Sequence, residues 1–193
     1  MTDRLASAGV AIPGAAPARE GVYRYDEAPD LRAKRLLNYE LPYDVADTLL
    51  DALFRTHLGD PKAFARALYL SPDMIAEMAR GGMTFGYHTQ SHRVLSRLSR
   101  DEQRRELAGG VGLVKRLTGQ QSVPFCYPYG FRHTYNQDTL DVLAETGYSV
   151  AFNTVRQPVA VPAPHRYGLP RFDTRDITRL AATASAAEQL ETS

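Results

Sequence analysis

The sequence has few of the features that mark secreted, membrane-bound or nucleic-acid-binding proteins. Its single cysteine, Cys126, excludes an internal disulfide and slightly favours a reducing compartment. The 23 Lys and Arg balance 22 Asp and Glu, and a formal charge of +1 argues against nucleic acid or an anionic membrane as a partner. No stretch approaches the ~18 apolar residues that cross a bilayer, and residues 1–18 lack a signal peptide's apolar core. These absences predict a cytoplasmic protein.

What the sequence does contain is an alternation of helix and strand patterns. Apolar residues at helical spacing, bounded by capping and stop residues, predict helices over 30–37, 44–58, 61–69, 72–80, 100–118 and 137–146. Short β-rich runs predict strands over 83–87, 122–126 and 148–155. Strands that alternate with helices are typical of a parallel α/β architecture.

The 193 residues are enough for one domain with a real core. Within it, residues 20–70 are interpreted as a helical insert and residues 71–180 as the α/β core. Residues 181–193, rich in Ala, Ser, Thr and Glu, form a tail. Residues 1–19 are either a short strand unit ended by Pro13 and Gly14 or a disordered leader, and composition alone leaves both open.

Residues 86–92 contain two histidines, His88 and His92, at a spacing that suits a metal. Two imidazoles four residues apart can bind one divalent cation if they share a helical face, or if one ends a strand and the other opens the next turn. Thr89 and Ser91 between them are expected to hold the turn by side-chain to backbone hydrogen bonds. The alternative is a pair of surface or capping histidines.

Three segments occur in a familiar order: His-Thr-x-Ser-His at 88–92, Tyr-Pro-Tyr-Gly at 127–130 and Leu-Pro-Arg-Phe-Asp at 169–173. The order and spacing resemble the NodB-type polysaccharide deacetylases, carbohydrate esterase family four. The resemblance implies a distorted (β/α) barrel and a carbohydrate substrate. It also implies a hydrolase that removes N-acetyl groups from an amino sugar, with a divalent metal, zinc by ligand type, held by His88 and His92.

The resemblance assigns roles to three further residues. The backbone amide of Tyr129 would stabilise the oxyanion of the reaction; the alternative is a proline-aromatic packing turn. Cys126 stands where many members of the family have arginine, so Arg171 is expected to supply the guanidinium and to pair with Asp173. The alternative for that pair is a surface ion pair of little energetic value.

One part of the family pattern is missing. The family's third metal ligand and general base are aspartates of an N-terminal Thr-Phe-Asp-Asp-Gly motif, and this sequence contains no Asp-Asp pair. Residues 5–14 resemble the unit that follows that motif, so we expect an N-terminally truncated barrel with low or no activity. The alternative is a catalytically inactive remnant or carbohydrate-binding module. A truncated parallel sheet would expose an unpaired edge, which predicts aggregation or pairing into a homo-oligomer.

Overall fold

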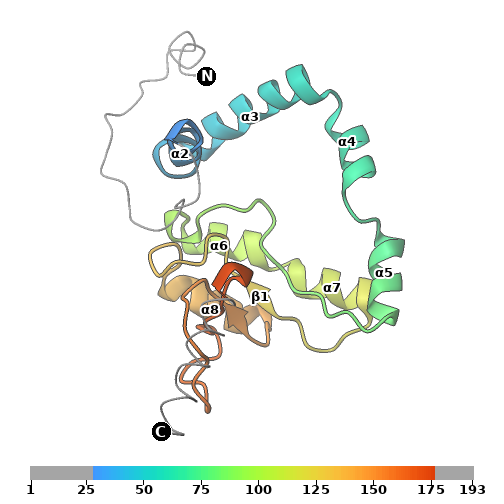
Figure 1. Ribbon diagram of the computed structural model, residues 1–193, viewed down its shortest axis with the longest axis vertical. Helices are drawn as coiled ribbons and strands as arrows, with labels where there is room; N and C mark the ends of the chain where they lie inside the picture. The colour runs from blue at the N-terminus through green and yellow to red at the C-terminus, as the bar shows by residue number, and fades with distance from the viewer. Residues whose placement is uncertain (1–27, 177–193) are drawn as a thin grey trace, which may run out of the picture. The chain divides into compact units, whose positions relative to one another are not determined.

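The computed structural model describes residues 28–176, which belong to two compact units, one ending at Phe64 and the other beginning at Ala65 (Figure 1). The expectations for residues 1–19 and 181–193 therefore lie outside the described residues. None of the helices in the described part is long and apolar enough to cross a membrane. The α-helices and the π-helix of this part are α2 (Ala28–Arg35), the π-helix η1 (Leu36–Glu40), α3 (Tyr43–Leu58), α4 (Pro61–Leu68), α5 (Pro72–Arg80), α6 (Arg100–Leu107), α7 (Gly110–Thr118) and α8 (Gln137–Thr146).

The first unit is built from α2, η1 and α3 around a small apolar core. Leu36, Leu41 and Ala46 are buried there, and half-buried leucine and valine side chains of η1 and α3 pack against them. Helix α3 ends at Gly59, whose positive φ of 83° is the conformation that glycine adopts at little cost. The sequence predicted this helix and its end.

In the second unit, side-chain caps set the helix boundaries that the sequence predicts. Ser71 Oγ accepts a hydrogen bond from the Met74 amide at the start of α5. Ser99 and Glu102 form a capping box at the start of α6. Asn136 caps α8, and Gly147, in the left-handed region, ends it. These local signals are sufficient because each is satisfied within one helical turn.

The single helix predicted over 100–118 is wrong, because the structure divides it into α6 and α7. The break falls where Gly110 meets aromatic side chains: a Cβ on Gly110 would overlap the Tyr148 hydroxyl and the Tyr87 ring. The Tyr148 hydroxyl also donates to the Leu107 carbonyl, at 2.8 Å, where α6 ends. Close packing and a side-chain hydrogen bond therefore take the place of a continuous helix.

The sheet of the described residues is parallel and short. Strand β1 (Phe125–Cys126) pairs with β2 (Ala151–Phe152), and isolated parallel bridges add Tyr87 beside β1 and Leu169 beside β2. This order confirms the α/β class, whereas closure into a barrel stays a prediction. The strand predicted over 83–87 is reduced to the bridge at Tyr87.

That reduction has a visible cause in the hydrogen bonds of the preceding residues. The Phe85 amide donates to Gln120 Oε1 at 3.0 Å, and Gln120 Nε2 donates to the Phe85 carbonyl at 2.7 Å. A side-chain amide thus occupies backbone groups that a strand would offer to a neighbouring strand.

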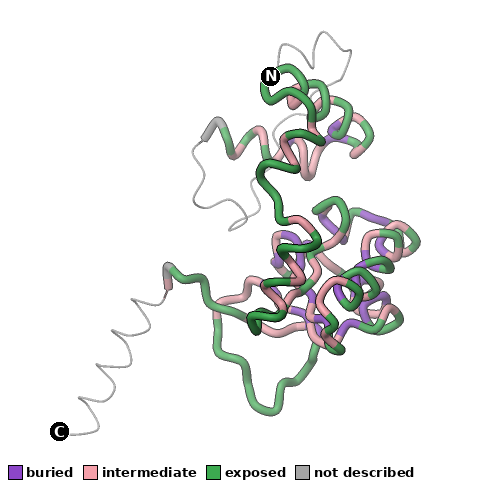
Figure 2. Tube along the Cα trace, turned by 90° about the vertical axis from the view of Figure 1, so that its right-hand side faces the viewer, coloured by how far each residue is buried: buried purple, intermediate pink, exposed green. Residues whose placement is uncertain are grey.

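The core of the second unit lies where α6, α7 and α8 meet the short sheet (Figures 1 and 2). Phe125, Tyr127 and Tyr148 are its largest fully buried side chains. Helices α6 and α8 are joined by Arg100, whose guanidinium contacts Asp138, Asp141 and Glu145 of α8. These ion pairs hold α6 and α8 together.

Candidate active site

The candidate residues gather at the carboxyl edge of the parallel segments, where α/β sheets place ligands. His88 follows the bridge residue Tyr87, and Tyr129 lies just after β1. The ring centroids of His88 and His92 are 4.8 Å apart, and those of His92 and Tyr129 are 5.0 Å apart. The structure thus brings three of the sequence-predicted residues into one cluster.

The imidazole of His88 is oriented by a backbone group of β1. Its Nδ1 lies 2.7 Å from the Cys126 carbonyl oxygen. Because a carbonyl can only accept, the neutral ring carries its proton on Nδ1 and keeps the lone pair on Nε2. A histidine whose other nitrogen donates to a carbonyl is the arrangement that metal-binding histidines usually have.

His92 is held as a neutral ring. Protein atoms displace water around its ring, and a charged His88 would repel it, so the pKa of His92 lies below its ordinary value. The neutral imidazole is the form that binds a transition metal. The lowered pKa of His92 therefore favours the form that a metal site needs.

The loop between the histidines has an unusual backbone. Thr89 and His92 have φ values of 67° and 57°, in the left-handed region. Thr89 Oγ1 accepts a hydrogen bond from the His92 amide at 3.0 Å, which confirms the predicted side-chain to backbone bond of Thr89. Ser91 behaves differently from the prediction, because its hydroxyl bonds a side chain of α6.

That side chain is Glu106, which sequence reasoning missed. Its carboxylate accepts hydrogen bonds from the Gln90 amide at 3.1 Å, the Ser91 amide at 2.9 Å and the Ser91 hydroxyl at 2.6 Å. A signal exists in the sequence, since Glu106 shares the inward face of α6 with buried Gln103 and Leu107. An acid on the buried side of an amphipathic helix needs donors, and the histidine loop supplies them.

The turn that carries Tyr129 is locked to residue 154. Tyr129 and Gly130 have φ values of 64° and 71°. The Thr154 amide donates to the Gly130 carbonyl at 3.0 Å, and the Thr154 hydroxyl donates to the Tyr129 carbonyl at 2.9 Å. A Cβ on Gly130 would lie 2.8 Å from Thr154 Cγ2 and 2.9 Å from its backbone nitrogen. Glycine is therefore required for the turn to approach Thr154 this closely.

Arg171 and Asp173 are placed differently from the expectation. The prediction of an ion pair between Arg171 and Asp173 is wrong, because each of these two described residues contacts a different partner. Arg171 Nη1 lies 3.7 Å from Cys126 Sγ, whereas Asp173 Oδ2 lies 3.7 Å from Nη2 of Arg156. The cause is the 3₁₀ turn η3 (Thr174–Asp176), in which the Asp173 amide donates to Asp176 Oδ2 at 3.1 Å. Arg156 also binds Asp176, at 2.8 Å, and these contacts hold the turn next to Arg156.

The donor set fits part of a metal site. His88 and His92 can supply two imidazole ligands, but residues 28–176 contain no group of three His, Cys, Asp or Glu side chains that could hold a metal ion. A catalytic zinc usually has three protein ligands and one open position. His88 and His92 could therefore supply two of these three ligands.

Comparison with known proteins identifies the family of the chain. A model of the polysaccharide deacetylase family matches residues 46–151, more than half of the chain. YxkH of Bacillus subtilis (strain 168), provisionally named a polysaccharide deacetylase, is 30% identical over 93 residues, which are 48% of this chain and 32% of that protein. A 30.6 kDa protein encoded in the fumA 3' region of Geobacillus stearothermophilus is 30% identical over 106 residues, 54% of this chain and 39% of its own. The chain therefore spans well under half the length of either relative.

Among solved structures, the chain is similar to the deacetylase PplD of Streptococcus pyogenes in complex with acetate, with a TM-score of 0.48 and 26% identity. That match covers 53% of this chain and 44% of the other. The extent of the family match, which includes both histidines and the Pro-Tyr-Gly turn, decides the assignment. The chain belongs to the polysaccharide deacetylase family.

Proposed function

We propose that this chain carries the metal-binding histidine pair of a deacetylase that removes N-acetyl groups from an amino-sugar or polysaccharide substrate. The observation that carries the proposal is the His88–His92 pair, with ring centroids 4.8 Å apart and the tautomer of His88 set by the Cys126 carbonyl. Surface histidines do not need such an orienting bond, whereas metal ligands do.

The residues around the pair have separate tasks in this proposal. Zinc, which suits imidazole ligands, would supply Lewis-acid polarisation of the acyl carbonyl. The Tyr129 amide, in a turn fixed by Thr154, would donate to the developing oxyanion, an interaction of ~3 kcal/mol when well placed. Arg171, beside Cys126, would orient the substrate by charge-assisted hydrogen bonds. Asp173 would act indirectly, through its contact with Arg156.

A second candidate function is carbohydrate binding without hydrolysis. The observation in its favour is that the described residues contain no group of three possible metal ligands, and that the sequence contains no Asp-Asp pair to serve as ligand and base. Hydrolysis needs a group that takes a proton from the attacking water. We therefore expect this chain to have low activity by itself.

Zinc titration by calorimetry tests the site. We expect the wild-type chain to bind one zinc with roughly micromolar affinity, as a site with two imidazole ligands and water allows. A His88→Ala, His92→Ala double variant should lose this binding. The matched control is His57→Ala, at the exposed end of α3, which should keep it. No zinc binding by folded wild-type protein, or equal binding by the double variant, would contradict the proposal.

The two candidate functions differ in a second measurement. Acetate release from an N-acetylglucosamine tetramer, measured with zinc present, should be slow but above the rate of the double variant if the chain is a hydrolase. Saturable binding of the tetramer with no acetate release above that background would favour the binding function. Both readouts use the same protein and the same ligand.

A further inference from the structure

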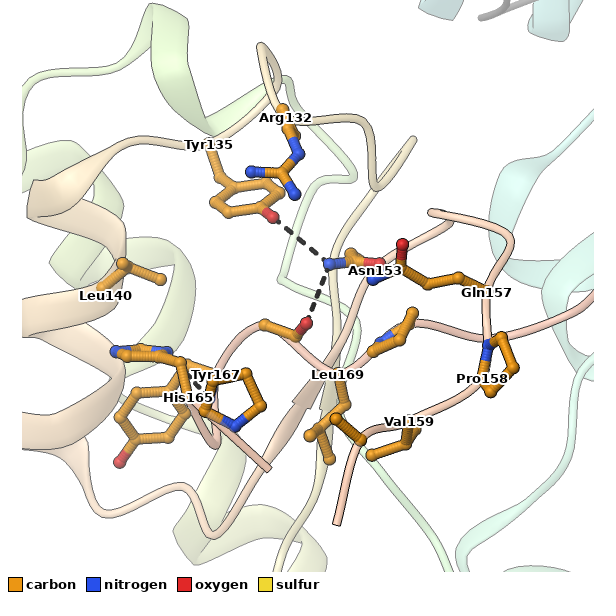
Figure 3. A pocket seen from close by; sticks show the side chains of 14 residues that line it. Arg132, Tyr135, Leu140, Asn153, Gln157, Pro158, Val159, His165, Tyr167 and Leu169 are labelled. Carbon is orange, nitrogen blue, oxygen red and sulfur yellow. Dashed lines mark hydrogen bonds between the residues drawn. The ribbon is translucent and has the colours of Figure 1, made fainter. Parts of the chain in front are cut away.

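A cavity of the second unit lies outside the histidine cluster. Its volume is about 390 Å³, within the ~300–1,000 Å³ range of small-ligand pockets. It is lined by the loop after the Pro-Tyr-Gly turn, one side of α8, the residue that follows β2 and the exposed loop 157–166 (Figure 3). Neither His88 nor His92 nor Tyr129 lines it. It is therefore a separate candidate site.

The floor of this cavity is preformed. Asn153 is buried, with 4% of its surface exposed, and its Nδ2 donates to the Gly168 carbonyl at 3.2 Å and to the Tyr135 hydroxyl at 3.4 Å (Figure 3). Its Oδ1 accepts from the Val155 amide at 2.9 Å. The Tyr135 ring stacks on buried Tyr127 with centroids 4.0 Å apart. Because these contacts already fix the side chains of the floor, binding of a ligand would not have to order them, which lowers the entropic cost of binding.

The residues that line the cavity include an arginine and no acidic residue. Arg132 is exposed at the cavity and makes no hydrogen bond or ion pair with any described residue, and none of the lining residues is Asp or Glu. Of the acids near the lining along the chain, Asp138 and Asp141 bind Arg100, and Asp173 and Asp176 bind Arg156. An unpaired guanidinium above a rigid amide floor favours an anion, and the fork geometry of arginine suits a carboxylate in particular.

The remaining lining residues suit a ligand the size of a sugar ring. Leu140, Val159 and Leu169 provide apolar surface, and Gln157 adds an amide that can donate or accept (Figure 3). We propose that this cavity binds a sugar-sized ligand that bears a carboxylate, with Arg132 as the partner of the charge. The acid could be a residue of the polymer bound at the histidine cluster or a separate small acid, and both share this chemistry.

The probe is glucuronate, with glucose as its neutral counterpart. Titration followed by backbone amide chemical shifts should give saturable changes at residues 131–140 and 153–170 with glucuronate. Glucose should bind at least roughly tenfold more weakly, because it lacks the charge-assisted hydrogen bond. Arg132→Gln should reduce glucuronate affinity to the glucose level, and Arg132→Lys should restore part of it. Arg116→Gln, on α7 and outside the lining, is the control and should change nothing.

Three outcomes would overturn the proposal: equal affinity for glucose and glucuronate, no saturable shifts at the lining, or equal glucuronate affinity in Arg132→Gln and wild type. A hyaluronan tetrasaccharide, which alternates glucuronate with N-acetylglucosamine, distinguishes the two sources of the acid. Shifts that extend to residues 88–92 and 129 would indicate a polymer that reaches both sites. Shifts confined to the cavity would indicate a separate small acid.

Discussion

At the scale of single residues, the backbone marks the candidate site as clearly as the side chains do. Among the described residues, the non-glycine positions with positive φ are Thr89, His92 and Tyr129, which lie in the histidine loop and in the turn beside it. The left-handed conformation costs an ordinary residue roughly 1–2 kcal/mol. Such a cost persists only where the surroundings fix the conformation, here through Glu106 and Thr154.

Glu106 is therefore predicted to be a positioning residue for the metal site. In Glu106→Gln, the neutral amide accepts more weakly from the Gln90 and Ser91 amides, so the histidine loop loses charge-assisted support. We expect zinc affinity, measured by calorimetry, to fall roughly tenfold, the lower end for groups that orient metal ligands. The control is Glu77→Gln on the exposed side of α5. Unchanged zinc affinity in folded Glu106→Gln would refute this role.

The sequence predicted the histidine pair and the Tyr129 turn because each is a contiguous segment with a recognisable pattern. It did not predict Glu106, whose role depends on a contact between α6 and a loop that precedes it. It also paired Arg171 with Asp173, which are close in sequence, whereas the η3 turn carries Asp173 to Arg156. Residue roles that tertiary contacts determine cannot be derived from spacing alone.

At the scale of elements, helix ends were predictable and strand lengths were not. Caps such as Ser71 and Asn136 act within one turn, so their residues are sufficient to place α5 and α8. Strand length depends on neighbours, and Gln120 occupies backbone groups that the run 83–87 would use for pairing. The division of α6 from α7 likewise depends on Tyr148, which is distant in sequence.

The packing at that division predicts opposite results for two adjacent glycines. A Cβ at Gly110 would overlap Tyr148 and Tyr87, whereas a Cβ at Gly109 would meet nothing within 4 Å. We expect Gly110→Ala to lower the free energy of unfolding by roughly 1–3 kcal/mol, the usual cost of overpacking. Gly109→Ala, with helical φ and ψ, should be neutral or stabilising by up to ~1 kcal/mol.

Urea denaturation of both variants measures the difference. Because the two positions share the same break between α6 and α7, a general effect of alanine on local helicity would appear in both. Equal unfolding free energies for the two variants would mean that the contact of Gly110 with the aromatic side chains does not limit packing there.

At the scale of the molecule, one chain of tyrosine hydroxyls connects the core of the second unit. Tyr127 donates to the Tyr167 carbonyl at 2.7 Å, Tyr167 to the Tyr148 carbonyl at 3.0 Å, and Tyr148 to the Leu107 carbonyl at 2.8 Å. The chain links the turn after β1, the loop before Arg171, the approach to β2 and the end of α6. The carboxyl edge that holds the candidate site thus depends on phenols that must stay protonated.

That dependence predicts a loss of stability at alkaline pH. Burial, and secondarily neighbouring tyrosines, raises the pKa of Tyr127 and of Tyr148 well above the usual value. The unfolded chain releases these protons near pH ~10, while the folded chain keeps them. Stability is therefore fully present below pH ~10 and falls as pH rises further, by at most ~1.4 kcal/mol per pH unit for each group.

Urea denaturation between about pH 8 and pH 11, with three proteins, tests this assignment. Tyr148→Phe should be less stable than wild type at neutral pH, by about 1 kcal/mol for its lost hydrogen bond to Leu107. Its alkaline slope should be shallower, because one phenol no longer releases a proton only on unfolding. Tyr69→Phe, at an exposed position, should keep the wild-type slope. If wild type and Tyr148→Phe lose stability in parallel above pH ~10, the Tyr148 phenol is not a source of the loss and other groups must titrate on unfolding.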